Sequence, residues 1–242
     1  MKGGFTIPTV NYKFERIEKK FWMSAEQYNR LLPVLLSHLQ YDGFGLSTVC
    51  NIYYDTPDFA LIRRSIERPS FKEKLRLRSY GIPTDSDTVF VEIKRKLNGI
   101  GYKRRISVPF GKAKKLLRGE AIRCDNPQIE EELLEFVRRY HPRPMVYLTY
   151  QRYAMTAGDD SAFRVTIDRD LKYRISEAEN PSEEGMRPIM ADQSAVLMEI
   201  KALGAIPRWL TDEMSRLKIY QAPFSKVGTC YIRHIAPICS CN

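Results

Sequence analysis

The chain has 242 residues, of which 43% are hydrophobic and 28% charged, a globular balance that excludes a disordered or fibrous protein. Its formal net charge of +10 favours a polyanionic partner, which is nucleic acid, an anionic membrane surface or a phosphorylated small molecule. Five cysteines without a paired CxxC pattern argue against a disulfide scaffold or a structural zinc site, and the absence of an apolar leader or of any apolar run of about 18 residues argues against export and membrane spanning. We therefore expect a soluble cytoplasmic protein.

Strand-like segments dominate the chain. Alternating apolar and polar residues, rich in β-branched and aromatic side chains, predict nine strands, over 11–23, 46–55, 71–80, 88–96, 101–109, 144–155, 162–171, 195–202 and 224–232. No internal repeat and no shift of composition marks a domain boundary. Residues 1–242 are therefore expected to form a single domain.

Helices are predicted between these strands. Ser24 and Gln27 have the spacing of a capping box, although Pro33 should bend or break the later turns of that helix. Asn126 and Pro127 form the start of a stronger helix, with a capping residue followed by a proline in the first turn. Helices are expected over 24–39, 111–117, 125–140 and 207–218, and an exposed loop over 176–195.

The segment FKEKLRLRSYG, residues 71–81, shows a charge pattern that decides the fold prediction. Strand side chains alternate with period two, so Lys74, Arg76 and Arg78 share one face and Leu75 and Leu77 share the other. Taken alone, such a segment is typical of a half-buried strand with its cations in water. The remaining strands must show whether the charged faces belong together.

The same pattern recurs in almost every predicted strand. One face per strand collects thirteen cations and five anions, a net +8 of the chain's +10, so the excess charge is concentrated on these faces. The cations are Arg16, Lys20, Lys74, Arg76, Arg78, Lys94, Lys96, Lys103, Arg105, Arg152, Arg164, Lys201 and Lys226, and the anions are Glu18, Glu92, Asp168, Asp170 and Glu199.

Two architectures could use such faces. A flat nucleic-acid platform needs aromatic residues between the cations so that bases can stack, and these faces offer only Phe14, Phe90 and Tyr150, with Tyr80 following Arg78. A closed antiparallel β-barrel would instead bring the charged faces to one interior, where a polyphosphate would neutralise them. We therefore predict an α+β fold, an antiparallel β-barrel with helices packed outside, and no nucleic-acid partner.

An ordered series of motifs supports this fold. RIEKK at residues 16–20 resembles an ExExK opening strand with Arg16 in place of the first glutamate, and it is followed by KKFW, NIYYDTPD, KLRLRSYG, VEIKRK, YKRR, TIDRD, EIK and SK. The series, over residues 10–232, resembles the VTC domain, the polyphosphate polymerase catalytic domain of the triphosphate tunnel metalloenzyme (CYTH-like) superfamily. The resemblance implies a triphosphate tunnel fold.

The resemblance also implies roles for individual residues. The basic positions would hold the triphosphate of ATP and the growing polyphosphate, and Glu199 would hold a divalent metal, manganese or magnesium, with Glu18 as a further metal candidate. The implied catalytic residues are Lys20, Arg76, Arg78, Lys94, Arg152, Arg164 and Lys226, and the substrate-binding residues add Lys74, Lys103 and Arg105. Arginine forks and lysine charges suit phosphate, and an acceptor phosphate could attack the γ-phosphate in line while ADP leaves.

Several alternatives stay open. Loss of the first glutamate to Arg16 should weaken water activation and favours the polymerase over a hydrolase of inorganic triphosphate or nucleoside triphosphates, and a non-catalytic polyphosphate or nucleic-acid binding module is the third hypothesis. A membrane partner protein at the inner face of a membrane would fit the polymerase. Glu18, Glu92 and Asp168 could pair with cations instead of a metal.

Other charged or polar residues have simpler expected roles. Lys96, Lys201 and Asp170 are expected at the rim because they lie near strand ends. Tyr53 and Asp55 are expected to build a turn.

Overall fold

The computed structural model describes residues 16–67, 69–158, 160–175 and 181–239. Its centre is a ten-stranded sheet in which eight strands follow the order β1-β10-β8-β7-β3-β4-β5-β6, while β2 pairs with β7 and β9 with β8. The strands are β1 (Arg16–Met23), β2 (Gln40–Tyr41), β3 (Ser47–Asp55), β4 (Phe71–Tyr80), β5 (Thr88–Leu97), β6 (Ile100–Pro109), β7 (Arg143–Ala157), β8 (Asp160–Ile175), β9 (Arg187–Pro188) and β10 (Val196–Leu203).

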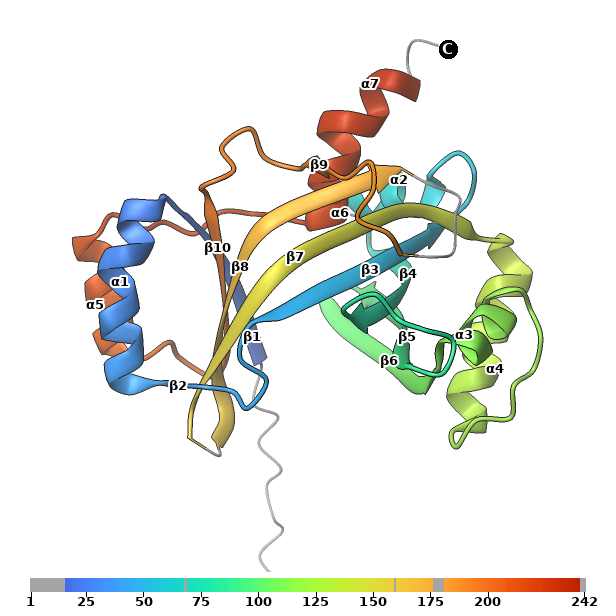
Figure 1. Cartoon of the computed structure of the whole chain (residues 1–242), viewed down its shortest axis with the longest axis horizontal. Coiled ribbons are helices and arrows are strands. Elements are labelled where there is room, and N and C mark those ends of the chain that lie inside the picture. The colour runs from blue at the N-terminus through green and yellow to red at the C-terminus, as the bar shows by residue number, and fades with distance from the viewer. Residues whose placement is uncertain (1–15, 68, 159, 176–180, 240–242) are drawn as a thin grey trace, which may run out of the picture.

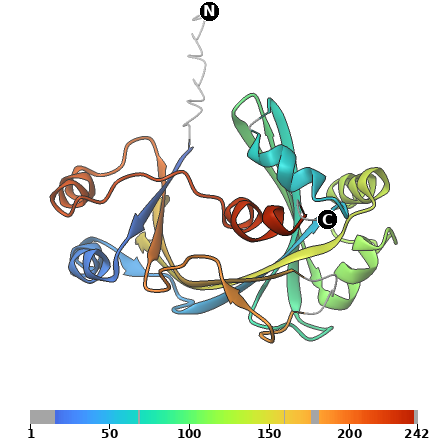
Figure 2. The same ribbon diagram turned by 90° about the horizontal axis from the view of Figure 1, so that it is seen from above.

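The sheet is antiparallel and curls into a half-barrel with helices on its outside, which confirms the predicted fold class (Figure 1 and Figure 2). β1 and β6 are the two ends of the strand order, and within the described residues no pairing joins them. The concave face is therefore open along one side, whereas the sequence predicts a closed barrel. Strand twist is sufficient to curl a sheet, but closure requires the two edge strands to meet.

Eight of the nine predicted strands are present, and the ninth, over 224–232, is wrong. That segment forms α6 (Lys226–Cys230), which continues into the π-helix η1 (Tyr231–Ile235) and α7 (Ala236–Cys239). The Ser225 hydroxyl accepts a hydrogen bond from the Gly228 amide at 3.2 Å, which caps the helix. Val227 and Cys230 are buried three residues apart, a helical spacing that the short alternating pattern concealed. Residues 11–15 of the first predicted strand lie outside the described residues.

The predicted helices are present as α1 (Ala25–His38), α3 (Phe110–Leu117), α4 (Pro127–Tyr140) and α5 (Arg208–Arg216). The capping box of Ser24 and Gln27 is formed at α1, and Asn126 caps α4. α1 continues through Pro33 to His38. Leu31 and Leu35 on either side of this proline are fully buried against the sheet, so packing holds the helix where the local sequence predicts a break.

A further helix that was not predicted, α2 (Ala60–Ile66), depends on Asp55. The fully buried carboxylate of Asp55 accepts hydrogen bonds from the backbone N–H groups of Leu61 and Ile62 at 2.9 and 2.8 Å and from Thr56 at 2.8 Å. It therefore satisfies donors that the helix leaves unpaired at its start. This confirms that Asp55 builds the turn.

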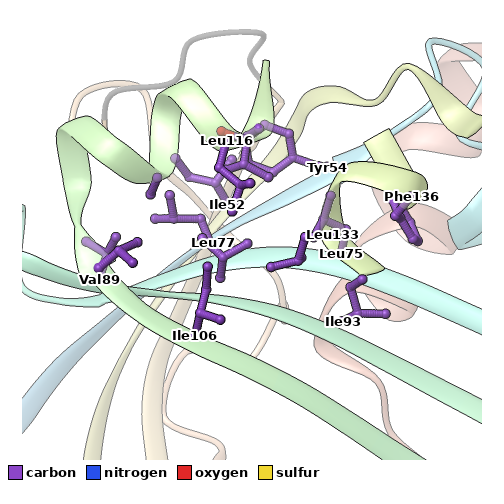
Figure 3. Packing of buried hydrophobic residues seen from close by; sticks show 14 of the residues in the cluster. Ile52, Tyr54, Leu75, Leu77, Val89, Ile93, Ile106, Leu116, Leu133 and Phe136 are labelled. Carbon is purple, nitrogen blue, oxygen red and sulfur yellow. The ribbon is translucent and has the colours of Figure 1, made fainter. Parts of the chain in front are cut away.

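The apolar strand faces pack under helices on the convex side. Leu75, Leu77 and Ile93 meet Leu116 of α3 and Leu133 of α4 in one cluster (Figure 3). A second cluster joins β1, β8 and β10 to α1 and α5. The leucines of FKEKLRLRSYG are therefore buried outside the half-barrel, and Lys74, Arg76 and Arg78 of β4 face its concave side.

The concave side is covered in part by the C-terminal helical segment. Figure 2 shows this segment lying within the curl of the sheet. Val227 and Cys230 of α6 share a buried cluster with Tyr53 of β3, Tyr150 of β7 and Leu197 of β10. α6 therefore places its own side chains next to the charged residues of the concave face.

Candidate functional site

Asp168 is the centre of the first group of charges on the concave face. Its carboxylate is fully buried and accepts two hydrogen bonds from Arg152, Nε to Oδ1 at 2.6 Å and Nη2 to Oδ2 at 2.7 Å. Lys226 Nζ donates to the same Oδ2 at 2.6 Å. Burial raises the pKa of Asp168, but Lys226 and Arg152 outweigh it and hold the pKa below its usual range. Asp168 therefore fixes two predicted phosphate-binding cations from different elements.

Glu92 of β5 centres a second group. Direct cross-strand pairing places Arg76 of β4 and Arg105 of β6 on either side of it. Its buried carboxylate lies 2.5 Å from Arg76 Nε, 2.6 Å from Lys103 Nζ and 3.4 Å from Arg105 Nε. Burial opposes ionisation, but Arg76, Arg78 and Lys103 lower the pKa of Glu92 to about 2. Both buried acids thus pair with cations, which is the simpler of the two roles expected for them.

Three cations of the same face, Arg78, Lys74 and Lys94, form no ion pair with a carboxylate among the described residues. Arg78 donates to Asn51 Oδ1 at 2.9 Å and to the Tyr150 hydroxyl at 3.2 Å, and Lys74 Nζ contacts Ser225 Oγ at 3.4 Å. Lys94 is exposed and lies directly between Lys74 and Lys103 in the sheet. Burial, followed by the charges of nearby lysines that include Lys94, lowers the pKa of Lys74 to about 8, although Tyr53 opposes this. Arg78 is near enough to Glu92 to lower the pKa of that carboxyl group, but Glu92 is already paired with Arg76 and Lys103, so this part of the face keeps an excess of positive charge.

Two tyrosines lie among these cations. Tyr53 accepts a hydrogen bond from Arg76 Nη1 at 3.4 Å, and its pKa is lowered to about 8 because Arg76, Lys74 and Arg78 outweigh the effect of burial. Tyr150 contacts Arg78 through its hydroxyl, and Lys226 Nζ lies 4.5 Å from its ring centroid. The sequence predicts a turn-building role for Tyr53, and the structure places it among the cations as well. Its shared parity with Asn51 and Asp55 was the sequence signal for a place in the site.

Glu199 of β10 and Glu18 of β1 are the two acids at the other end of the concave face, and together they are called the acidic wall. Glu199 lies directly opposite Lys20, and Glu18 lies directly opposite Lys201, so acids and lysines alternate between the two strands. Glu199 Oε2 is 3.7 Å from Arg152 Nη2, and its Oε1 is 3.7 Å from Lys201 Nζ. Burial raises the pKa of Glu199, but a hydrogen bond with Glu18 and the charges of Lys201 and Lys20 lower it well below its usual range. The two carboxylates therefore lie next to each other and face the cations.

These two carboxylates fit a divalent metal that is bound by the protein and by phosphate oxygens of the substrate at the same time. Within the described residues, no group of three or more His, Cys, Asp or Glu side chains could hold a metal by itself. Mg²⁺ is commonly bound through one or two carboxylates together with substrate phosphates and water, and Mn²⁺ accepts the same hard oxygen ligands. Glu18 and Glu199 would be the protein's ligands in such a site.

The remaining predicted site residues are spread over the face. Lys20 Nζ donates to the Phe224 carbonyl oxygen at 3.1 Å and lies 3.6 Å from Glu18. Arg164 binds Asp42 Oδ2 at 2.9 Å and lies four residues along β8 from Asp168, so it is separate from the Asp168 group. The side chain of Arg16 falls outside the described residues, and its effect on chemistry stays a prediction.

The expected rim residues differ from one another. Lys96 is exposed, and Asp170 is exposed and pairs with Lys172 at 2.8 Å, as expected for the rim. Lys201 is half-buried beside Glu199, so it belongs to the concave face instead.

Comparison with known proteins identifies relatives of this chain. A family model described as VTC domain matches residues 15–233. Vacuolar transporter chaperone complex subunit 4 of Trypanosoma brucei brucei is 26% identical over 203 residues, which cover 66% of this chain and 26% of the relative. The protein of the same name in Trypanosoma cruzi is 23% identical over 218 residues, which cover 71% of this chain and 27% of the relative. The chain thus spans about a quarter of the length of these curated relatives.

Solved structures show more distant likenesses. A proposed adenylate cyclase from Vibrio parahaemolyticus has a TM-score of 0.45 and 12% identity, with 88% of this chain and 96% of that chain covered. The Mimivirus capping enzyme triphosphatase has a TM-score of 0.35 and 12% identity, with 84% and 88% covered. None of the helices in the described part of the chain is long and apolar enough to cross a membrane.

Proposed function

The chain belongs to the VTC domain family, and we propose that it is an ATP-dependent polyphosphate polymerase that works with manganese or magnesium. One observation carries the proposal above all. Lys74, Arg78 and Lys94 on the concave face form no ion pair with a carboxylate among the described residues. Glu18 and Glu199 lie on β1 and β10 beside Lys20 and Lys201, and these two lysines are near Lys74 and Lys94 across the concave face. A polyphosphate chain would supply negative charge to these cations, and a metal bound to that chain would supply positive charge to Glu18 and Glu199.

The proposed reaction lengthens polyphosphate by one phosphate. An oxygen of the terminal phosphate of the acceptor chain attacks the γ-phosphorus of ATP, the bond from that phosphorus to the β–γ bridging oxygen breaks, and ADP leaves with the electron pair. No covalent protein nucleophile is needed. The products are ADP and a polyphosphate that is one phosphate longer.

The cations position and neutralise the phosphates in this proposal. Arg76 and Arg152 are held by Glu92 and Asp168, so their guanidinium groups are oriented before substrate binds. Arg78 and Lys74 exchange neutral partners for phosphate oxygens, which makes their contacts charge-assisted. A divalent metal bound at Glu18 and Glu199 would neutralise charge on the phosphate oxygens.

The place of the protein in a larger assembly is part of the same proposal. The trypanosome relatives are named as subunits of a vacuolar transporter chaperone complex, and this chain spans about a quarter of their length. We propose that it acts on the cytoplasmic side of a membrane beside a membrane protein partner. Co-purification of the tagged chain from membranes, compared with the soluble fraction, tests this assignment.

The activity test distinguishes three functions. Purified protein is incubated with ATP and MnCl₂, and the products are separated into long polyphosphate and free phosphate. Long polyphosphate with matching ADP supports the polymerase, free phosphate without polymer indicates a hydrolase, and binding without either product indicates a binding module. Arg78→Ala should abolish polymer formation, and Arg208→Ala, which alters a side chain 93% exposed on α5, is the matched control.

A further inference from the structure

Phe90 is an aromatic residue of the concave face that the proposed phosphate chemistry does not use. It lies on β5 directly opposite Arg78 of β4 and Ser107 of β6. Its ring is half-buried, and the ring of Tyr80 meets it edge-on with centroids 6.1 Å apart. Tyr80 itself is 58% exposed. An apolar, partly open surface therefore adjoins a strongly basic one.

The guanidinium group of Arg105 covers this ring. Its Cζ lies 3.5 Å from the centroid of Phe90, a distance at which a planar guanidinium stacks on an aromatic face. Glu92 Oε1 holds Arg105 Nε from the side at 3.4 Å. The side chain of Arg105 is nevertheless 37% exposed, although one face of it is covered by the ring. The stack thus presents a flat, oriented guanidinium plane toward the solvent side of the half-barrel.

The place of this stack relative to the phosphate-binding cations suits a nucleotide. Arg76, Glu92 and Arg105 form one cross-strand row, and Arg78 and Phe90 belong to the next. Neighbouring rows on one face are two residues apart, or about 6.6 Å along the strand. The stack also lies at β6, the open edge of the sheet. A nucleotide could therefore place its triphosphate among the arginines and its base at the edge.

We propose that Phe90 and Arg105, bordered by Tyr80, form a stacking platform for the purine base of the nucleotide, so that the site distinguishes ATP from inorganic triphosphate. The inference rests on the proposed function, because it assigns a nucleotide to the same face. Purine bases stack on guanidinium planes as well as on aromatic rings, and this stacking does not require hydrogen bonds to the edges of the base. The γ-phosphate then points from the edge strand toward Lys74 and the acidic wall, and ADP leaves along the open side.

The test compares two ligands on the same variants. Dissociation constants of ATP and of inorganic tripolyphosphate are measured by calorimetry for the parent, for Phe90→Leu and for Arg105→Lys, which keep apolar volume and charge respectively. Base stacking of about 1–3 kcal/mol corresponds to roughly fivefold or more in affinity, so the ratio of the ATP constant to the tripolyphosphate constant should rise about fivefold in each variant. Tripolyphosphate affinity should stay within about twofold of the parent for Phe90→Leu.

Matched controls come from the convex face of β6, the strand that carries Arg105 and pairs with the strand of Phe90. Tyr102→Leu removes a 50% exposed aromatic side chain from the convex face of β6, and Arg104→Lys makes the same exchange one residue before Arg105. Both controls should leave the ratio unchanged. Circular dichroism and melting temperature confirm that each variant is folded.

The outcomes separate the two proposals. A ratio that is unchanged in Phe90→Leu and Arg105→Lys, whether both affinities fall together or neither falls, overturns the platform and leaves the phosphate site standing. A parent protein that binds neither ATP nor tripolyphosphate overturns the proposed function itself. If the ratio of the ATP constant to the tripolyphosphate constant rises in the variants but the parent makes no polymer, the platform is supported and the polymerase function is overturned.

Discussion

Lys226 and Asp168 are 58 residues apart in sequence, yet Lys226 Nζ donates a 2.6 Å hydrogen bond to the fully buried Asp168 carboxylate. The lysine comes from a helix inside the curl and the aspartate from a central strand. Arg152 donates to both oxygens of the same carboxylate. This buried group joins the C-terminal segment to the sheet and sets the geometry of two candidate phosphate ligands.

Replacing Asp168 by Asn should destabilise the protein. Removing one partner of a buried ion pair leaves the others uncompensated and costs about 3–5 kcal/mol. Urea denaturation of Asp168→Asn should show this loss. Asp170→Asn on the same strand is the control, since Asp170 is exposed and its partner Lys172 is a surface lysine. Equal stability of the two variants would show that Asp168 does not hold the segment in place.

Stability should also depend on pH through Glu92. Its pKa in the folded protein is about 2, below the value of about 4.3 expected in the unfolded chain. A lowered carboxyl pKa contributes stability that is complete above the unfolded value and is lost as the pH falls through the folded one, here between about 4.3 and 2. The expected loss is on the order of 3 kcal/mol. Unfolding free energies of the parent and of Glu92→Gln between pH 6 and 2 measure it, and the variant should show a flatter profile.

Tripolyphosphate should raise the melting temperature of the parent. The uncompensated cations repel each other, and an anion that binds only the folded state stabilises it in proportion to the logarithm of its concentration over its dissociation constant. The shift should shrink at high salt because the interaction is electrostatic. Arg78→Gln should lose most of the shift, and Arg208→Gln should keep it. A melting temperature that does not respond at low salt would contradict a phosphate-binding face.

The charge state of Lys74 should make triphosphate affinity pH-dependent. Its pKa in the free protein is about 8, lowered from 10.5, so it loses its proton as the pH rises through this value. Affinity should therefore fall by up to about tenfold between pH 7 and 9, since one unit above the pKa only about a tenth of the side chains are charged. Lys74→Arg remains charged over this range and should show a smaller fall. Calorimetry in buffers of matched ionic strength makes the comparison, and identical profiles would exclude Lys74 as a ligand.

A substitution at Glu199 should affect polymer formation without abolishing phosphate binding. If Glu199 and Glu18 hold the metal, Glu199→Gln should reduce polymer formation by about 100-fold or more, because charge stabilisation at the phosphate oxygens is worth several kcal/mol. Tripolyphosphate binding measured without metal should persist. Glu131→Gln, at a 66% exposed position on α4, is the control. An active, manganese-responsive Glu199→Gln protein would remove this residue from the metal site.

Local pattern was sufficient for most of the elements. Period-two alternation in β4 and β5 identified which face carries charge, because a strand turns each successive side chain to the opposite side whatever its neighbours are. Caps at Ser24 and Asn126 likewise act within three residues of their own position. These features need no knowledge of the rest of the chain. The antiparallel fold with helices outside could therefore be predicted.

Long-range packing decided the rest. Lys226 was predicted on a strand, and it reaches Asp168 from a helix because Val227 and Cys230 are buried against the sheet. Whether Glu92 binds a metal or its neighbours depended on the register that sets Arg76 and Arg105 beside it. The open edge between β1 and β6 depends on the total curl of the sheet. Each of these outcomes depends on free energies of contact between residues far apart in the sequence, and such terms are absent from any local pattern.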